Sequence, residues 1–255
     1  MLKGPRILHV LMDGMQEDSD NLGLGLAPGD HHYRAYVGPP EDYDLVAAMT
    51  FNLLTTLGLR QNHTLLDVGC GSLRVGRLLI PYLNRRNYVG IEPNRWLVEE
   101  GVAHEIGESL LEIKEPQFIY TDSPSDLASR EGSFDFVVAQ SIFSHCGWDL
   151  MTRWLRGISA CLRPSGALVA TFIKSDIGSE RAGWIYPDCV AHTEPSLREA
   201  ASAMGFTFKI LDWKHPRQTW ALFARELFDT SWFEHRPLTW NTMVAAAARG
   251  ISSGP

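Results

Sequence analysis

The stretch LLDVGCGSLRVG, residues 65–76, places an acid and two closely spaced glycines directly after an apolar run. Gly69 and Gly71 can take positive φ angles and let the backbone approach a ligand, because glycine has no Cβ atom. Glu92 ends the next apolar run, where a carboxylate can accept hydrogen bonds from both hydroxyls of a ribose. Residues of these types in this order predict a site for a ligand that contains adenosine.

The spacing of the glycines distinguishes between kinds of adenosine ligand. A dinucleotide fingerprint GxGxxG that begins at Gly69 needs a glycine at position 74, and the chain has Arg74 there. The turn is therefore a poor cradle for a pyrophosphate. A cofactor with adenosine and no pyrophosphate is favoured, and a nicotinamide-dependent oxidoreductase is disfavoured.

Strand-like and helix-like stretches alternate around this turn from about residue 64 to residue 226, which predicts a parallel α/β sheet with right-handed crossovers. Strands are expected at 64–69, 87–92, 117–122, 133–141, 167–173, 206–213 and 218–226. Helices are expected at 43–59, 73–83, 95–106, 149–162 and 196–204, with Pro164 and Gly166 ending the fourth. The linker KHPR before the last strand is too short for a crossover helix, so that strand is expected to run antiparallel.

Composition limits the class of protein. The chain has 255 residues, 45% hydrophobic content and a net charge of −7, which favours one large folded domain and gives no electrostatic sign of nucleic-acid binding. No apolar run approaches the roughly 20 residues of a membrane span, and the N-terminal apolar run is too short for a signal peptide. A cytoplasmic protein is expected. The four cysteines have neither zinc-ligand nor disulfide-scaffold spacing, and no metal site is predicted.

Five motifs in order carry a resemblance to a known family: LLDVGCGSLRVGRLLIPYL, YVGIEPN, IYTDSPSDL, SFDFVVAQSIFSHC and LRPSGALVATF. Over roughly residues 45–226 the chain resembles the class I S-adenosylmethionine-dependent methyltransferases, and it is most similar to their small-molecule branch. The resemblance implies a Rossmann-like fold with a seven-stranded, mostly parallel sheet, an antiparallel last strand and helices on both faces. We expect a methyltransferase domain over residues 45–226, an N-terminal cap over 1–44 and a C-terminal extension over 227–255.

The resemblance also implies cofactor contacts in the loops after the strands: Asp67, Gly69, Cys70, Gly71, Ser72, Arg74, Glu92, Pro93, Asn94, Asp122, Ser123, Gln140 and Ser141. In this arrangement residues 67–72 and 140–141 border the methionine portion, and Glu92 holds the ribose. Pro93 and Asn94 line the adenine, whose amino group donates a hydrogen bond to Asp122.

For three residues the sequence allows a second role. Arg74 either pairs with the cofactor carboxylate or covers the surface. Asp122 also belongs to an Asp/Ser/Pro loop that satisfies its own backbone. Trp96 either covers the adenine or packs in the core.

Two segments outside the motifs are candidates for closing the site. Residues 31–44, HHYRAYVGPPEDYD, either fold as a cap across the strand ends or form an irregular surface connection. In the cap, Tyr36 and Gly38 are the expected cofactor contacts, while His31 and His32 lack a third metal ligand. Residues 179–195 follow the fifth strand and are expected to form an acceptor wall. The predicted acceptor contacts are Tyr33, Trp148, Trp184 and Tyr186, although such aromatic side chains also serve as hydrophobic packing.

His145 is the candidate catalytic base, because an imidazole accepts a hydroxyl proton at neutral pH. Its alternative is a structural role, either as a donor to a loop carbonyl or packed under Trp148. The predicted function is methyl transfer from S-adenosyl-L-methionine to an oxygen or nitrogen of a small molecule, natural product or sugar-like. The alternative is a non-catalytic S-adenosylmethionine-binding partner protein. No nucleic-acid or membrane partner is expected, and homo-oligomerisation stays open.

Overall fold

The computed structural model of the 255-residue chain describes residues 21–231. Residues 1–20 of the expected cap and residues 232–255 of the expected C-terminal extension lie outside this range, so the expected domain boundaries stay predictions. Between residues 21 and 231, the chain forms no helix with the length and apolar content that crossing a membrane requires.

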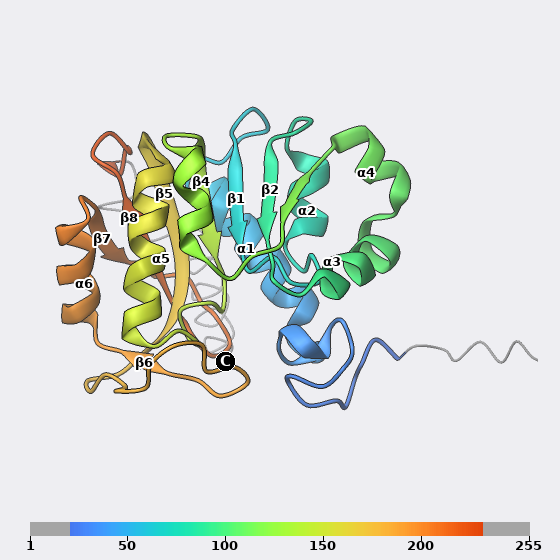
Figure 1. Ribbon diagram of the computed structural model, residues 1–255, viewed down its shortest axis with the longest axis horizontal. Coiled ribbons are helices and arrows are strands. Elements are labelled where there is room, and N and C mark those ends of the chain that lie inside the picture. Colours follow the sequence, from blue (N-terminus) through green and yellow to red (C-terminus); the bar gives the residue numbers. More distant parts are fainter. Residues whose placement is uncertain (1–20, 232–255) are drawn as a thin grey trace, which may run out of the picture.

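One mixed sheet organises the fold, with strand order β3-β2-β1-β4-β5-β8-β7 (Figure 1). Its strands are β1 (Leu65–Val68), β2 (Tyr88–Ile91), β3 (Gln117–Ile119), β4 (Phe134–Ala139), β5 (Leu162–Lys174), β7 (Thr207–Ile210) and β8 (Thr219–Ala224). The strand β8 runs antiparallel to both of its neighbours, β5 and β7. This arrangement confirms the predicted Rossmann-like methyltransferase fold. The order of the strands reverses between β1 and β4, and open α/β sheets bind their ligands at such a point.

Helices cover both faces of the sheet (Figure 1). They are α1 (Tyr43–Thr56), α2 (Gly76–Tyr82), α3 (Arg95–Gly101), α4 (Glu108–Lys114), α5 (Trp148–Cys161) and α6 (Glu194–Ala203). In β1, Leu66 faces a core that contains side chains of α5 and α6, whereas Leu65 faces a core that contains side chains of α1, α2 and α3. Burial on both faces explains why the strand is a continuous apolar run apart from Asp67.

The elements differ from the sequence expectations at a few positions. The residues from Val102 to Ile106 form a π-helical turn, and α4 follows after Gly107 as a helix that the sequence pattern did not predict. A 3-10 helix at Pro124–Arg130 replaces an expected loop. The strand β5 starts directly after α5, so Pro164 and Gly166 lie within it and the expectation that they precede the strand is wrong. The two-residue strand β6 (Ala191–His192), which pairs with the end of β5, is too short to produce a periodic pattern.

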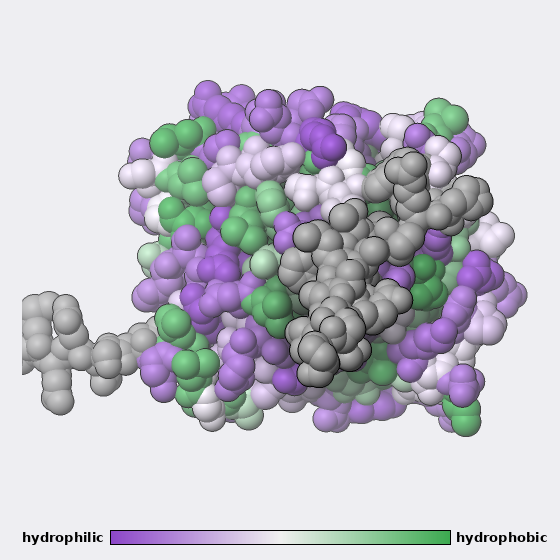
Figure 2. Space-filling model, turned by 180° about the vertical axis from the view of Figure 1, so that it is seen from behind, coloured by the Kyte–Doolittle hydropathy of each residue, from purple (hydrophilic) through white to green (hydrophobic). Residues whose placement is uncertain are grey.

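The rear surface mixes hydrophilic and hydrophobic residues (Figure 2). Large apolar side chains that stay exposed include Leu45 on α1 and Leu227 after β8. Scattered exposed apolar residues are normal on folded proteins, so the search for a binding site turns to the edge of the sheet where the parallel strands end.

Candidate active site

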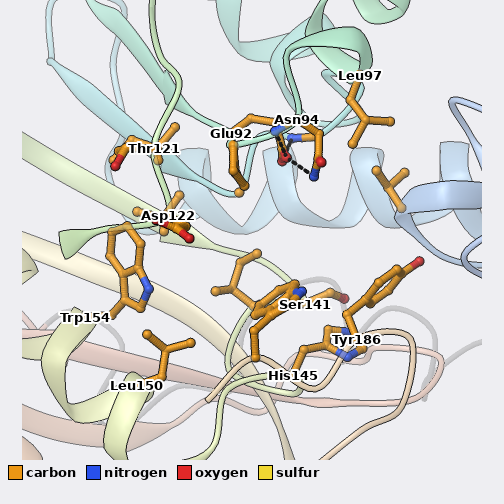
Figure 3. Close-up of a pocket in the computed structure, with 18 of the residues that line it drawn as sticks. Glu92, Asn94, Leu97, Thr121, Asp122, Ser141, His145, Leu150, Trp154 and Tyr186 are labelled. Atoms are coloured by element: carbon orange, nitrogen blue, oxygen red, sulfur yellow. Dashed lines mark hydrogen bonds between the residues drawn. The ribbon is translucent and has the colours of Figure 1, made fainter. Parts of the chain in front are cut away.

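A cavity of about 610 Å³ lies at the carboxyl ends of the parallel strands. Its size is within the range of small-molecule sites, roughly 300–1,000 Å³. The sequence-predicted residues that line it are Tyr36, Gly69, Gly71, Arg74, Glu92, Pro93, Asn94, Asp122, Ser123, Gln140, Ser141, His145, Trp184 and Tyr186. Figure 3 shows side chains from several elements directed at this shared space.

The glycine turn after β1 is shaped by close approaches. Gly69 and Gly71 have φ angles of +72° and +53°, which favour glycine. A Cβ atom on Gly71 would lie 2.7 Å from Cγ1 of Val37, and one on Gly69 would collide with the side chain of Ile142. The glycines therefore let the cap and the turn after β4 pack directly onto the floor of the cavity.

Glu92 is fixed at the end of β2 by three donors. Its Oε2 accepts a hydrogen bond from the Gly71 amide at 3.1 Å. Its Oε1 accepts from the amide of Asn94 at 2.9 Å and from its side-chain nitrogen at 2.8 Å (Figure 3). Burial raises the pKa of Glu92, and these hydrogen bonds oppose the rise. A positioned carboxylate with lone pairs left over can accept from a pair of hydroxyls.

The loop after β3 and one face of α5 form the next part of the wall. Thr121 accepts a hydrogen bond from the Ser123 amide at 3.0 Å, which shapes the loop around Asp122. Leu150 and Trp154 of α5 lie opposite this loop (Figure 3). Both lie on the helix that the sequence predicts over residues 149–162, and no separate signal in the sequence indicated that they line the cavity.

Arg74 lies buried beneath the cap. Its Nη1 donates to the Val37 carbonyl at 3.0 Å, and its Nη2 donates to Oε1 of Gln140. Nε2 of Gln140 donates in turn to Oγ of Ser141 at 2.5 Å. Burial lowers the pKa of Arg74. The alternative that Arg74 covers the surface is wrong, because only 8% of the residue is exposed and it lines the cavity.

His145 combines a loop contact with a place in the cavity. Its Nδ1 is 2.7 Å from the Asp188 carbonyl, so Nδ1 carries the proton and Nε2 is left as an acceptor. Burial lowers the pKa of His145. Its ring contacts Tyr186 at 4.8 Å and Trp184 at 5.7 Å between centroids. His145 therefore has both the hydrogen bond expected of a structural histidine and the position in the cavity expected of a base.

The described part of the cap crosses the open strand ends. Tyr36 and Val37 line the cavity, and the Tyr186 hydroxyl donates to the Tyr36 carbonyl. Arg34 anchors the segment through Glu105, at 2.7 Å. Trp96 packs against Tyr36 at this junction and is not part of the cavity wall.

Six predicted site residues lie behind or beside the cavity: Asp67, Cys70, Ser72, Gly38, Tyr33 and Trp148. Asp67 accepts from the Tyr88 hydroxyl at 2.8 Å, and burial raises its pKa to about 7. Tyr33 packs on Tyr43 and His104, away from the acceptor wall. Trp148 packs on His192 and not over His145.

The remaining predicted residues sit close to the glycine turn. The hydroxyl oxygen of Ser72 lies 3.2 Å from that of Tyr43. Cys70 is buried next to Gly90, and Gly38 lies beside Arg74. His31 stacks on Trp96. Within residues 21–231, no group of three or more His, Cys, Asp or Glu side chains could hold a metal ion.

Cavity residues that sequence reasoning missed come mainly from apolar positions: Val37, Val68, Ile91, Leu97, Thr121, Pro124, Ile142, Leu150, Arg153, Trp154 and Gly183. Most of them read as ordinary core or loop residues, so pattern and spacing contained no sign of their position. The exceptions lie in the quoted motifs: Val68, Ile91, Thr121, Pro124 and Ile142.

Comparison with known proteins agrees with this geometry. Residues 66–168 match a family model described as a methyltransferase domain. Magnesium protoporphyrin IX methyltransferase from Synechocystis PCC 6803, solved with bound SAM, is similar to the chain at 16% identity, with a TM-score of 0.55 and coverage of 73% of this chain and 81% of that one.

Two further structures share the fold. Burkholderia thailandensis 1,6-didemethyltoxoflavin-N1-methyltransferase has 22% identity and a TM-score of 0.54, with coverage of 74% of this chain and 80% of that one. The [4+2]-cyclase SpnF has 18% identity and a TM-score of 0.53, with coverage of 72% and 81%. Residues 66–168 thus match a methyltransferase domain, and the strand order gives the chain the Rossmann-like fold of the class I S-adenosylmethionine-dependent methyltransferases.

Proposed function

We propose that the protein transfers the methyl group of S-adenosylmethionine to a small molecule, and that the acceptor atom is a hydroxyl oxygen. One observation carries the proposal: a single cavity has the fixed Glu92 carboxylate on one wall and an imidazole with a free acceptor nitrogen, His145, on another. The first suits a ribose and the second suits a hydroxyl that must lose its proton.

The residues of the cavity fit the cofactor. Glu92 would accept from the ribose hydroxyls, and Asp122 with Pro93 and Asn94 would border the adenine. Gly69 and Gly71 of the glycine turn line the part of the cavity that the remaining chain of the cofactor would occupy. When bound, the cofactor supplies a methyl group that is already electrophilic, so the protein mainly needs to align the acceptor and exclude water.

His145 would act on the acceptor. As the acceptor oxygen takes the methyl group, the proton of its hydroxyl moves to Nε2 of His145, which is oriented by the Asp188 carbonyl. The lowered pKa keeps the imidazole neutral at pH 7, as a base requires. A nitrogen acceptor that is neutral at the start has less need of this group, which is why the geometry favours oxygen.

A wall of aromatic rings supports a small, flat acceptor. Trp184 and Tyr186 stack at 6.1 Å between centroids, and both line the cavity beside His145. The toxoflavin enzyme and the protoporphyrin enzyme named above act, by their descriptions, on ring compounds. We therefore propose an acceptor that carries its hydroxyl on or next to a ring.

The second candidate function is binding of the cofactor without methyl transfer. It is kept because SpnF, a protein of this fold, is described as a [4+2]-cyclase, so the fold alone does not fix the reaction.

One experiment separates the two functions. The protein is incubated with methyl-labelled S-adenosylmethionine and a panel of hydroxylated and aminated ring compounds, and labelled product and S-adenosylhomocysteine are measured by mass spectrometry. Methylation of hydroxyl compounds supports the proposal. Tight cofactor binding with no product from any compound favours the non-catalytic function, and product from amines alone contradicts the oxygen assignment.

A further inference from the structure

Backbone hydrogen bonds join the loop after β4 to the acceptor wall, residues 179–195. The Ile185 amide donates to the His145 carbonyl at 2.9 Å, and the Gly147 amide donates to the Gly183 carbonyl at 2.8 Å. His145 therefore lies on a loop whose main chain is paired with the wall. The position of the loop and the position of the wall depend on each other.

A histidine of β6, His192, holds two further carbonyls of this loop. Its Nε2 lies 3.1 Å from the carbonyl oxygen of Phe143 and 3.1 Å from that of Cys146. Both neighbours are acceptors only, so Nε2 carries the proton and donates to them. The Val190 amide donates to the Ser144 carbonyl at 2.8 Å. Every carbonyl from Phe143 to Cys146 thus accepts a hydrogen bond from the wall.

His192 is buried, and it does not line the cavity. Only 2% of the residue is exposed, and Phe143 and Cys146 are buried as well. Burial lowers the pKa of His192, so the ring is neutral at pH 7 and Nε2 supplies its one N–H donor to the loop. Without this donor, two buried carbonyls would lose a hydrogen bond, and the loop would have to move to recover one.

Gly147 lets the two main chains approach closely. A Cβ atom on it would lie 2.3 Å from the Arg181 carbonyl oxygen and 2.6 Å from Cα of Ala182. Both are backbone atoms of the wall, so neither can turn aside as the end of a side chain could. The φ angle of Gly147 is −58°, which any residue adopts, so it is the lack of space that requires glycine here.

The register between loop and wall decides which nitrogen of His145 carries the proton. Asp188 belongs to the wall, and its carbonyl accepts from Nδ1 of His145 at 2.7 Å. In a neutral imidazole, Nε2 is an acceptor only while Nδ1 keeps its proton. A shift of the wall would remove the acceptor of Nδ1. The proton could then move to Nε2, which would no longer serve as a base.

We propose that His192 and Gly147 are positioning residues for the base. They hold the loop of His145 in register with the wall, so that the Asp188 carbonyl keeps the proton on Nδ1 and leaves Nε2 open to the acceptor. The inference rests on the proposed function, because that function gives His145 its role as a base. Neither positioning residue lines the cavity, so both act through His145.

The first test follows the tautomer of His145 by nitrogen-15 NMR of histidine-labelled protein saturated with S-adenosylhomocysteine. The His145→Gln protein identifies the signals. The wild type should show a protonated Nδ1 and an unprotonated Nε2. In His192→Leu and in Gly147→Ala, the proton should be shared between the two nitrogens. His192→Gln should restore the wild-type spectrum, because the amide nitrogen of glutamine can donate from nearly the same place.

Two variants serve as matched controls. Gly178→Ala adds a Cβ atom just before the wall, where the nearest heavy atom would be 3.8 Å away, so the wall need not move. His63→Leu removes an imidazole at the opposite end of β1. Both controls should keep the wild-type tautomer of His145.

Turnover of two acceptors separates misplacement of the base from general damage. Phenol must lose its proton during methyl transfer, whereas 4-nitrophenol ionises by itself near neutral pH. His192→Leu should lower the kcat for phenol by about 10²-fold, the loss that a misplacement of about 1 Å can cause. The kcat for 4-nitrophenol should change much less, and the affinity for S-adenosylhomocysteine should stay the same.

The outcomes bear on two separate claims. A wild-type tautomer in folded His192→Leu and Gly147→Ala proteins, or equal losses with the two phenols, overturns the positioning role. If His192→Leu does not fold, Gly147→Ala provides the same test. If the wild type methylates neither phenol, the result counts against the proposed function, while the tautomer spectra still decide the positioning role.

Discussion

At the scale of single residues, Glu92 has the best-defined position in the cavity. Two backbone amides and one side-chain amide hold it, so it is oriented before any ligand arrives. A preorganised group loses little entropy on binding, which makes its removal costly for the ligand. The same three donors would lose their acceptor if the carboxylate were removed.

Glu92→Ala should weaken S-adenosylhomocysteine by roughly 1–3 kcal/mol, the usual cost of leaving hydrogen-bonding partners unpaired. Calorimetry gives the affinity, and circular dichroism checks that the fold is intact. Glu99→Ala on the exposed side of α3 serves as the matched control and should bind normally. A folded Glu92→Ala protein with wild-type affinity would remove Glu92 from the site.

His145→Ala should lower turnover of a hydroxyl acceptor by about 10²-fold or more, while cofactor affinity stays nearly unchanged. The pKa of His145 lies below its usual value of about 6.5, so the wild-type rate should be at its plateau at pH 7 and fall as acid protonates the ring. The control is His63→Ala, at the opposite end of β1. If the variant keeps the rate and the pH profile of the wild type, His145 is structural.

At the scale of elements, the glycine turn and the cap are one packing unit. The side chain of Val37 rests where a side chain on Gly71 would be, so the turn sets how closely the cap approaches. A change in the turn should therefore move the cap and weaken ligand binding.

Gly71→Val should abolish tight cofactor binding, because the new side chain displaces Val37 and the backbone must hold a φ angle of +53°. Gly132→Val is a matched control. Gly132 has a φ angle of +58° and no heavy atom within 4 Å of an added Cβ, so that variant has the backbone strain alone. Affinity and thermal unfolding of both proteins separate the two effects, and equal losses of affinity would show that the contact with Val37 does not matter.

The regular elements were largely predictable, for physical reasons that also explain the failures. The apolar runs of β1, β2 and β4 and the short linker before β8 follow from burial and chain geometry, and they predicted the sheet correctly. The helix α4 was missed because it has only seven residues and none is fully buried, although Leu110 and Leu111 pack against the core. The cavity contact of Trp154 was missed because the residue fills its helical core position and faces the cavity from that same place.

The site residues also divide into those that the sequence could predict and those that it could not. Glu92 and the glycines were predictable because their chemistry depends on the end of a strand, which periodicity locates. Asp67 belongs to the same motif, yet its side chain turns under the loop to Tyr88. The direction of a side chain at a strand end depends on packing partners from distant elements, and spacing alone does not contain that information.

At the scale of the whole molecule, ligand binding and folding are linked. The cavity draws its walls from the cap, the glycine turn, the loops after β2, β3 and β4, and the segment after β5. A ligand that contacts all of them stabilises the folded state and not the unfolded chain.

S-adenosylhomocysteine at 100 times its dissociation constant should raise the free energy of unfolding by about 2.7 kcal/mol. For a domain of this size that corresponds to a rise of roughly 5–11 °C in the unfolding midpoint. The oxidised nicotinamide dinucleotide at the same concentration should cause no shift, because Arg74 stands where the fingerprint needs glycine. A shift with the dinucleotide alone would revive the oxidoreductase interpretation.

The hydrogen bond from Tyr186 to the Tyr36 carbonyl has a kinetic consequence. It ties together two wall segments that are 150 positions apart in the sequence, and we expect ligands to pass when it opens. Tyr186→Phe keeps the ring and removes the bond, so association and dissociation of S-adenosylhomocysteine should both accelerate by similar factors in stopped-flow traces. Unchanged rates would contradict this. In the expected case, this hydrogen bond sets the residence time of the ligand without changing its affinity. Release of S-adenosylhomocysteine would then limit the turnover rate of the enzyme.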